Sequence, residues 1–292
     1  MLLYSFYNAP LIDSTQSNKV SLRFVDDSMF LAITDLVDEA HSMLHNMMEH
    51  PKGGFDWSIS HNSPFKLSKL ALMDFPHSPQ DCASTNLTIT HHNTDNSTTT
   101  QTVNTVTSYK YLSMLFNSKL RCTAHCAKVT ASATWWSFQI VCLARTSGGM
   151  PPSPVHQLYN TVAVPAFTYA ADVWYTGIHK LVESIKNQGS IAVTNKLVSV
   201  QRHVAKLFVG SLSSTAGNIM DVHANLLPVD ILFHKILFRA ATRIASLPAT
   251  HPLHHLSCKA ASNYVKHHRS PLHDLFFTTK VSPSEVETVV AT

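Results

Sequence analysis

Several features that would classify a protein at once are missing from this chain of 292 residues. It has no run of about 18 uncharged apolar residues, so we expect no transmembrane helix. The opening sequence MLLYSFYNAPLID lacks the basic region and the small-residue cleavage site of a secretory signal peptide. The cysteines number five, an odd count spread along the chain, which favours a reducing compartment over a disulfide framework. We therefore expect an intracellular protein, in the cytoplasm or nucleus, with no membrane partner.

Charged residues are also scarce, at 14% of the chain, while apolar residues make up 45%. This balance supports a packed core and argues against global disorder. No internal repeat, Ser/His/Asp triad or glycine-rich phosphate loop is recognisable. The sequence thus lacks the motifs of triad hydrolases and P-loop proteins.

The few charges are distributed unevenly. Residues 1–107 hold 5 Lys and Arg against 11 Asp and Glu, a balance of −6, whereas residues 108–292 hold 17 against 7, a balance of +10. An acidic half beside a basic half suggests metal binding in the first and polyanion binding in the second. Attraction between the two halves explains the same asymmetry, and the charge count does not separate the two interpretations.

The stretch RFVDDSMFLA places the adjacent carboxylates Asp26 and Asp27 between two short apolar runs. This pattern predicts a β-hairpin with the acidic residues at its tip. Two neighbouring carboxylates repel each other, and a bound divalent cation is one way to offset that repulsion. The alternative is a polar turn that keeps aspartate in water.

The spacing of apolar residues predicts an α+β piece followed by helices. In residues 1–118 we expect the hairpin, a helix from about Leu36 that ends at residues 51–54, strands at 65–73 and 109–116, and a polar loop at 76–106 with a short strand near 87–90. Helices are predicted at 122–143, at 155–173 with a kink at Pro165, at 193–208, after a Thr215 cap, and at 229–244. The expected domains are 1–118, 119–248 and a His-rich C-terminal tail, 249–292.

Several segments, in order along the chain, resemble the reverse transcriptases of non-LTR (LINE-type) retrotransposons, and their sequences are most similar to those of fungal elements. FVDD at 24–27 is similar to the family's metal-binding signature. NSPFKLSKLALM at 62–73 is similar to its "N…SK…M" segment, and YKYL at 109–112 to its "YKYLG" primer-grip strand. LYNTVAVPAFTYAADVWY at 158–175 resembles its thumb. The resemblance covers roughly residues 5–275 and implies a partial palm followed by an all-α, thumb-like domain.

The resemblance implies an RNA-directed DNA polymerase that uses two Mg²⁺ ions, with Mn²⁺ as a substitute, for nucleotidyl transfer. Asp26 would be the main metal ligand and Asp27 the second. Lys69 would lie near the triphosphate and protonate the pyrophosphate, or it is an ordinary solvated lysine. Tyr109, Lys110, Tyr111 and Leu112 would lie against the primer, or they form a core strand. The implied partners are an RNA template, a DNA primer and nucleoside triphosphates.

The departures from the family pattern matter as much as the matches. The family's third aspartate and its QGSPLSP-like nucleotide segment have no counterpart before the hairpin, where the only acidic residue is Asp13. Arg23 stands where the family has glycine, and Ser113 replaces the glycine after YKYL, so bulk at both turns is expected to disturb the hairpin. The family's ribonuclease H domain is absent as well. We expect a fragment or degenerate copy that is inactive as an isolated chain.

Basic residues recur on two of the predicted helices. Lys235, Arg239 and Arg243 share one face, and Arg202 and Lys206 share another. They are candidates for binding nucleic-acid phosphates, and solvated helix faces are the alternative. The stretch HPLHHLSC, with His251, His254, His255 and Cys258, has metal-like spacing in an expected loop, and His267, His268 and His273 follow it. It lacks the two clear ligand pairs of a typical zinc site.

Three hypotheses follow from the sequence. The chain is a reverse-transcriptase fragment, a non-enzymatic nucleic-acid-binding remnant, or a decayed reading frame of a transposon.

Overall fold

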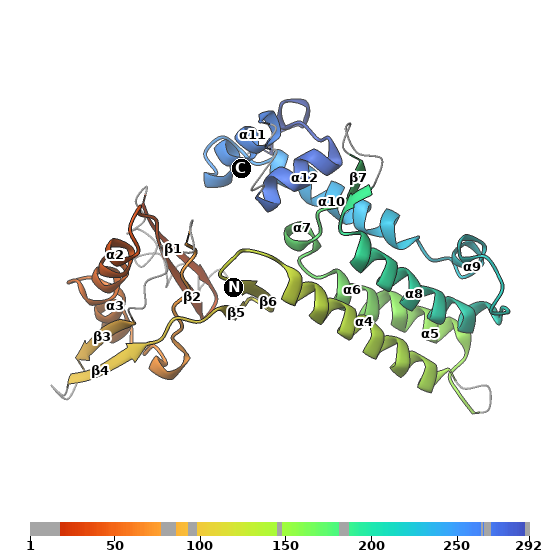
Figure 1. The fold of residues 1–292 in the computed structure, drawn as a ribbon, viewed down its shortest axis with the longest axis horizontal. Coiled ribbons are helices and arrows are strands. Elements are labelled where there is room, and N and C mark those ends of the chain that lie inside the picture. The colour runs from red at the N-terminus through yellow and green to blue at the C-terminus, as the bar shows by residue number, and fades with distance from the viewer. Residues whose placement is uncertain are drawn as a thin grey trace. The chain divides into compact units, whose positions relative to one another are not determined.

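The structure of this chain is a computed structural model that describes residues 18–76, 86–92, 98–144, 148–180, 187–263, 265 and 270–289. The chain divides into two compact units, Met1–Ala124 and His125–Thr292. Helices and small antiparallel sheets of two strands each make up the described residues (Figure 1), so the expected α+β class is confirmed.

Among the residues that the structure describes, the first unit contains three hairpins and two α-helices. Its elements are β1 (Lys19–Phe24), β2 (Asp27–Ala32), α2 (Val37–Glu49), α3 (Gly54–Ser60), a 3₁₀ turn (Leu67–Lys69), β3 (Leu87–His92), β4 (Thr98–Val103), β5 (Ser108–Tyr111) and β6 (Met114–Asn117). Helix α2 packs against both β2 and β3. The buried core of this unit consists of Met48, Phe55, Leu72, Ile89 and Val103.

The expected hairpin around FVDD and the helix from about Leu36 are both confirmed. The strand predicted over 65–73 is wrong, because a 3₁₀ turn replaces it and only Leu72 forms a single bridge, to Thr105. Leu67 and Leu70 both pack against the core. Residues three apart point to opposite faces of a strand but to the same side of a 3₁₀ turn, so burying both side chains favours the turn.

The single strand predicted over 109–116 is also wrong, because the chain reverses at Leu112 and Ser113 to form the β5–β6 hairpin. Both turn residues have positive φ angles, 44° for Leu112 and 66° for Ser113. Two consecutive positive φ angles characterise a type I′ turn, which normally carries Asn-Gly. The sequence Leu-Ser gives no such signal, so the turn was not anticipated.

The second unit is mainly helical. It contains α4 (Thr123–Leu143), α5 (Pro152–Leu158), a π-helical turn (Tyr159–Ala163), α6 (Val164–Thr168), α7 (Ala171–Trp174), β7 (Ile178–Lys180), β8 (Asn187–Gly189), α8 (Ile191–Val209), α9 (Gly217–His223), α10 (Val229–Ala245), α11 (Pro252–Ser262), α12 (Pro271–Thr279) and a 3₁₀ turn (Pro283–Glu285). The helices predicted at 122–143, 193–208 and 229–244 are confirmed. The β7–β8 hairpin shows that the unit is not all-α, and α11 occupies the stretch expected to be a loop.

The expected kink at Pro165 takes the form of the π-helical turn that precedes it. Proline lacks the N–H for a helical hydrogen bond and its ring crowds the preceding turn, and a wider turn relieves that crowding. The helix then ends at Tyr169, and Ala170 adopts a left-handed conformation with φ 53°. Tyr175, which directly follows α7, stacks on Phe233 of α10, with ring centroids 4.3 Å apart, in the core of this unit.

Candidate functional site

The FVDD hairpin has a strained two-residue turn. Phe24 pairs with Asp27, so Val25 and Asp26 form the turn. Val25 has a φ of 55°, whereas Asp26 has no positive φ. This combination is the pattern of a type II′ turn, which favours glycine at the first position. A β-branched residue there costs about 1–2 kcal/mol, and strain of this kind tends to occur at functional sites.

The carboxylates of Asp26 and Asp27 are exposed at the tip of this hairpin. Neither carboxylate forms a hydrogen bond or an ion pair with another residue in the part of the chain that is described. Their oxygens are therefore accessible to a cation. Mg²⁺ commonly takes one or two protein carboxylates and completes its octahedron with water and phosphate oxygens, so the pair fits part of such a site. No group of three metal-ligating side chains occurs among the described residues.

Arg23 does not lie at the turn. It lies within β1 opposite Ser28, and its guanidinium carbon is 4.1 Å from the ring centroid of Trp57. Trp57 in turn stacks on His61, with ring centroids 4.7 Å apart. This cation–π contact ties the hairpin to α3. The expectation that bulk at Arg23 would disturb the turn is therefore wrong, since Val25 is the residue that occupies the glycine-like conformation.

The β5–β6 hairpin carries the segment that resembles the primer grip, and it is electrostatically coupled to the FVDD hairpin. Burial raises the pKa of Tyr111 above its ordinary value, and the negative charge of Asp27 raises this pKa further. Such coupling requires the phenol to lie within reach of the Asp27 charge. Residues 84 positions apart in the sequence are thus brought together.

Lys69 lies at the end of the 3₁₀ turn, and its backbone carbonyl is 3.5 Å from the hydroxyl of Tyr109, which donates to it. This long and weak hydrogen bond connects the "SK" segment to β5. The side chains of Lys69, Tyr109 and Lys110 are all exposed, so the alternative of a core strand does not apply to Tyr109 or Lys110. The first unit therefore gathers all three of its resembling segments near one another.

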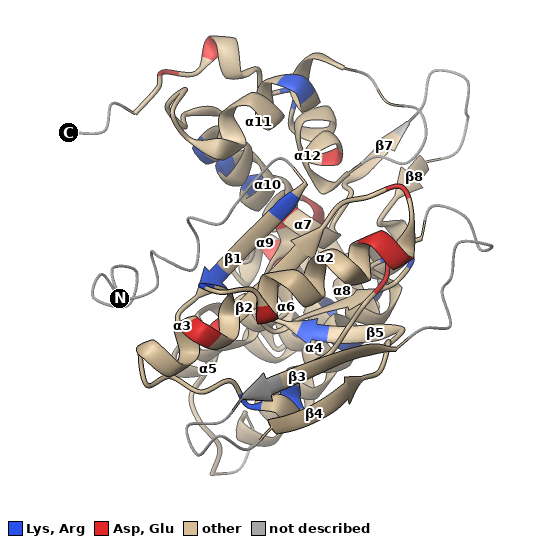
Figure 2. Ribbon diagram, turned by 90° about the vertical axis from the view of Figure 1, so that its left-hand side faces the viewer, with Lys and Arg blue, Asp and Glu red and all other residues tan. Residues whose placement is uncertain are grey.

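In the second unit, α10 presents Lys235 and Arg239 to solvent, and neither side chain is ion-paired with another described residue. Arg243 follows on the same helix but lies 3.7 Å from a carboxylate oxygen of Asp172. Between the two free cations lies Phe238, which is 48% exposed. Phe238 is not among the residues predicted from the sequence, although its position three residues after Lys235 places it on the same face. Figure 2 marks the charged positions along the ribbon.

Arg202 and Lys206 of α8 are less suitable for binding phosphate. The guanidinium of Arg202 donates to the carbonyls of Ser213 and Thr215, at 3.1 Å and 2.8 Å. Arg202 therefore holds the loop between α8 and α9. Thr215 is not the cap of α9, because the N-cap is Ala216 and has no side-chain hydrogen bond. Lys206 is half-buried near the end of α8.

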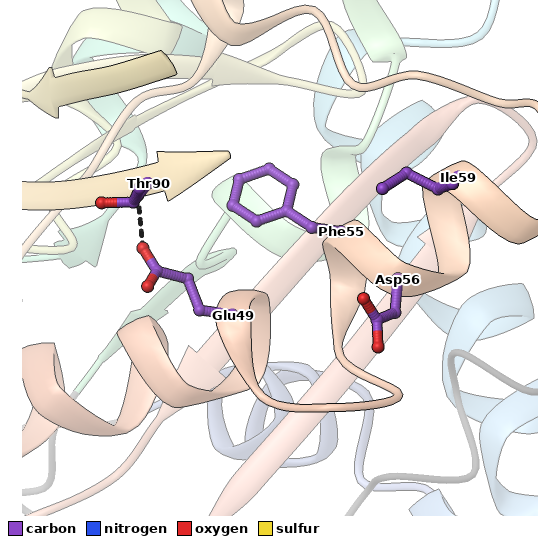
Figure 3. Close-up of a pocket in the computed structure, with 5 residues that line it drawn as sticks. All are labelled: Glu49, Phe55, Asp56, Ile59 and Thr90. Carbon is purple, nitrogen blue, oxygen red and sulfur yellow. Dashed lines mark hydrogen bonds between the residues drawn. The ribbon is translucent and has the colours of Figure 1, made fainter. Parts of the chain in front are cut away.

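A small cavity of about 70 Å³ lies between α2, α3 and β3 (Figure 3). It is lined by Glu49, Phe55, Asp56, Ile59 and Thr90. The Glu49 carboxylate accepts a hydrogen bond from the backbone N–H of Thr90. Asp56 accepts one from the N–H of Lys52 at 2.9 Å. Both carboxylates have structural partners, and the cavity has room for one or a few water molecules rather than a nucleotide.

Comparisons of the chain with protein-family models, with curated proteins and with solved structures found no match. Among the described helices, none combines the length and the apolar character needed to cross a membrane.

Proposed function

We propose that this chain is the C-terminal palm and thumb part of an RNA-directed DNA polymerase of the non-LTR retrotransposon type. In the full-length enzyme, Asp26 and Asp27 would be ligands of the catalytic cations, and the β5 strand would hold the primer. The isolated chain would bind a cation and nucleic acid without extending a primer. This proposal implies that the full-length enzyme binds nucleic acid and nucleoside triphosphates.

The observation that supports it most is the grouping of the resembling segments in the first unit. Asp27 acts electrostatically on Tyr111, and the carbonyl of Lys69 accepts a hydrogen bond from Tyr109. A polymerase needs its metal ligands beside the strand that positions the primer terminus, because transfer requires an aligned 3′-hydroxyl. Chance similarity of short motifs gives no reason for this proximity.

The residues of this chain would act by position and charge. A bound Mg²⁺ would supply activation of the primer 3′-hydroxyl and neutralisation of the triphosphate. The turn at Val25 and Asp26 places both carboxylates at the exposed tip of the hairpin, where a cation could reach them. The exposed side chains of Tyr109 and Lys110 would contact the primer backbone, with Lys110 pairing with a phosphate.

Cation binding can be measured without activity, by titrating Mn²⁺ and following the paramagnetic signal of the free ion. We expect the parent chain to bind Mn²⁺ and the Asp26→Asn/Asp27→Asn variant to lose most of that binding. The variant Asp35→Asn, which removes another exposed carboxylate from the same unit, is the matched control and should bind as the parent does. Equal binding by all three proteins would contradict the assignment of the hairpin.

Primer placement can be tested by photocrosslinking. A DNA primer with a photoreactive base at its 3′ end, annealed to RNA, should crosslink to the peptide that contains residues 108–117. Crosslinks spread over the basic helices alone would argue against a primer-gripping role for β5. Primer extension by the isolated chain that requires Asp26 would overturn the expected inactivity.

A second candidate is a nucleic-acid-binding protein without catalytic activity. The exposed face of α10 favours it, because Lys235 and Arg239 flank the half-exposed ring of Phe238. Cations bind phosphates and an aromatic ring stacks on bases, whatever the sequence of the nucleic acid. This candidate predicts nucleic-acid binding that is insensitive to Asp26→Asn/Asp27→Asn and independent of divalent cations.

A further inference from the structure

Helix α11 carries a cysteine and a histidine in direct contact. The thiol sulfur of Cys258 lies 3.6 Å from Nε2 of His254, one helical turn earlier. The other ring nitrogen, Nδ1, lies 2.9 Å from the carbonyl oxygen of Leu247. A carbonyl can only accept a hydrogen bond, so Nδ1 must donate. In the neutral imidazole, Nε2 is then the unprotonated nitrogen, and it faces the thiol.

This arrangement contains the three parts of an activated nucleophile. Cys258 supplies the sulfur, His254 the base, and the Leu247 carbonyl fixes the tautomer and the orientation of the ring. The helix is held in place because α11 packs against α10 and α12, with Ser257 and Ala260 buried. Both Cys258 and His254 are half-buried, so a small reagent can reach the sulfur.

The neighbouring histidines do not turn the pair into a zinc site within the described structure. His251 caps α11, with its Nδ1 accepting a hydrogen bond from the N–H of Leu253 at 3.1 Å. No third metal-ligating side chain joins His254 and Cys258 among the described residues. His267 and His268, which follow HPLHHLSC in the sequence, lie outside the described residues.

We propose that Cys258 is a reactive thiol that forms a mixed disulfide with low-molecular-weight disulfides, with His254 as its base. The thiol proton moves to Nε2 of His254, and the thiolate attacks one sulfur of the small disulfide. A new S–S bond forms at Cys258 while the original S–S bond breaks. The leaving thiolate takes the proton back from the imidazolium and departs as a thiol, so one disulfide is exchanged for another with no other oxidant.

Two of the other described cysteines, Cys142 and Cys122, provide internal controls. Cys142 of α4 is exposed and has no hydrogen-bond partner among the described residues. Cys122 is half-buried, and burial raises the pKa of its thiol, which disfavours the reactive thiolate. Exposure alone therefore predicts that Cys142 reacts first, whereas the proposal predicts that Cys258 does.

The test uses the full chain and oxidised glutathione as the probe, with modification of each cysteine followed by peptide mass spectrometry. We expect Cys258 to react about threefold or more faster than Cys142 near neutral pH. His254→Gln should lower the rate at Cys258 to that of Cys142 or below, while Cys142 keeps its parental rate. His251→Gln, a histidine replaced on the same helix, should leave the rate at Cys258 unchanged.

Unfolding of the His254→Gln variant would expose Cys258 and speed its reaction, so a slower reaction cannot come from lost structure. An unchanged rate at Cys258 in this variant, or a faster rate in a variant that circular dichroism shows to be folded, overturns the proposal. So does a parental Cys258 that reacts no faster than Cys142.

Discussion

Replacement of Lys235 and Arg239 together by alanine tests whether α10 binds nucleic acid through phosphates. These two cations are chosen because both are exposed and neither is ion-paired with a described residue, whereas Arg243 lies 3.7 Å from Asp172 and Arg202 holds a loop. Alanine is the best helix former, so the double variant should remain folded.

The expected magnitude follows from counterion release. Each phosphate neutralised on a duplex contributes about 0.9 to the slope of log affinity against log salt, so loss of two contacts should reduce the slope by about 1.8. Between about 50 and about 200 mM salt, this change amounts to a roughly twelvefold smaller loss of affinity in the variant than in the parent. The weakening should be the same for unrelated duplex sequences, because phosphates carry no sequence information.

The assay is a fluorescence-anisotropy titration of a labelled duplex at several salt concentrations. The matched control is Lys196→Ala/Lys259→Ala, which removes the same charge from exposed positions on α8 and α11. If only net charge matters, the control pair will reduce the slope as much as the α10 pair does. An equal reduction of the slope by the control pair would refute the reasoning. An unchanged slope in the α10 variant would refute it as well, and so would no binding by the parent at low salt.

Three further predictions concern stability. Ser113→Gly should stabilise the first unit by up to about 1 kcal/mol, because glycine adopts a φ of 66° without a Cβ clash, and a higher urea midpoint would show it. Burial, with the charge of Lys128, lowers the pKa of His125 below its ordinary value, so the unfolded chain binds this proton more readily than the folded chain does. The stability of the second unit should fall as pH drops through the unfolded pKa of about 6.5, and a His125→Gln variant should show a smaller fall in urea midpoint between neutral and acidic pH. Arg202→Ala should lower the free energy of unfolding by about 1–3 kcal/mol, because two hydrogen bonds to backbone carbonyls are lost, and it should leave the salt dependence of nucleic-acid binding unchanged. Arg202→Lys should not restore the stability, because lysine lacks the planar guanidinium fork, and full rescue by lysine would contradict this role of Arg202.

Local patterns in the sequence were sufficient to predict the long helices and the first hairpin. Apolar residues at helical spacing set the buried faces of α8 and α10, and Gly210, with a φ of 64°, ends α8. Pro228 directly precedes the first turn of α10. These features depend on interactions between residues a few positions apart, which a single sequence displays directly.

Contacts between distant segments decided the rest. The segment 65–73 has the sequence pattern of a strand, but it contains a 3₁₀ turn because both Leu67 and Leu70 pack against one core. The stretch HPLHHLSC, which was expected to be a loop, lies in and around helix α11, whose buried face packs on α10 and α12. The partners of Arg23, Arg202 and Cys258 could not be inferred from spacing alone.

The candidate site shows the same division. The residue pattern alone singled out Asp26 and Asp27, because adjacent carboxylates between apolar runs are visible in a linear chain, whereas the YKYL segment was singled out only by the family resemblance. The proximity of Asp27 to Tyr111 was determined only by tertiary structure. An electrostatic interaction depends on distance in space, and packing of the intervening residues sets that distance.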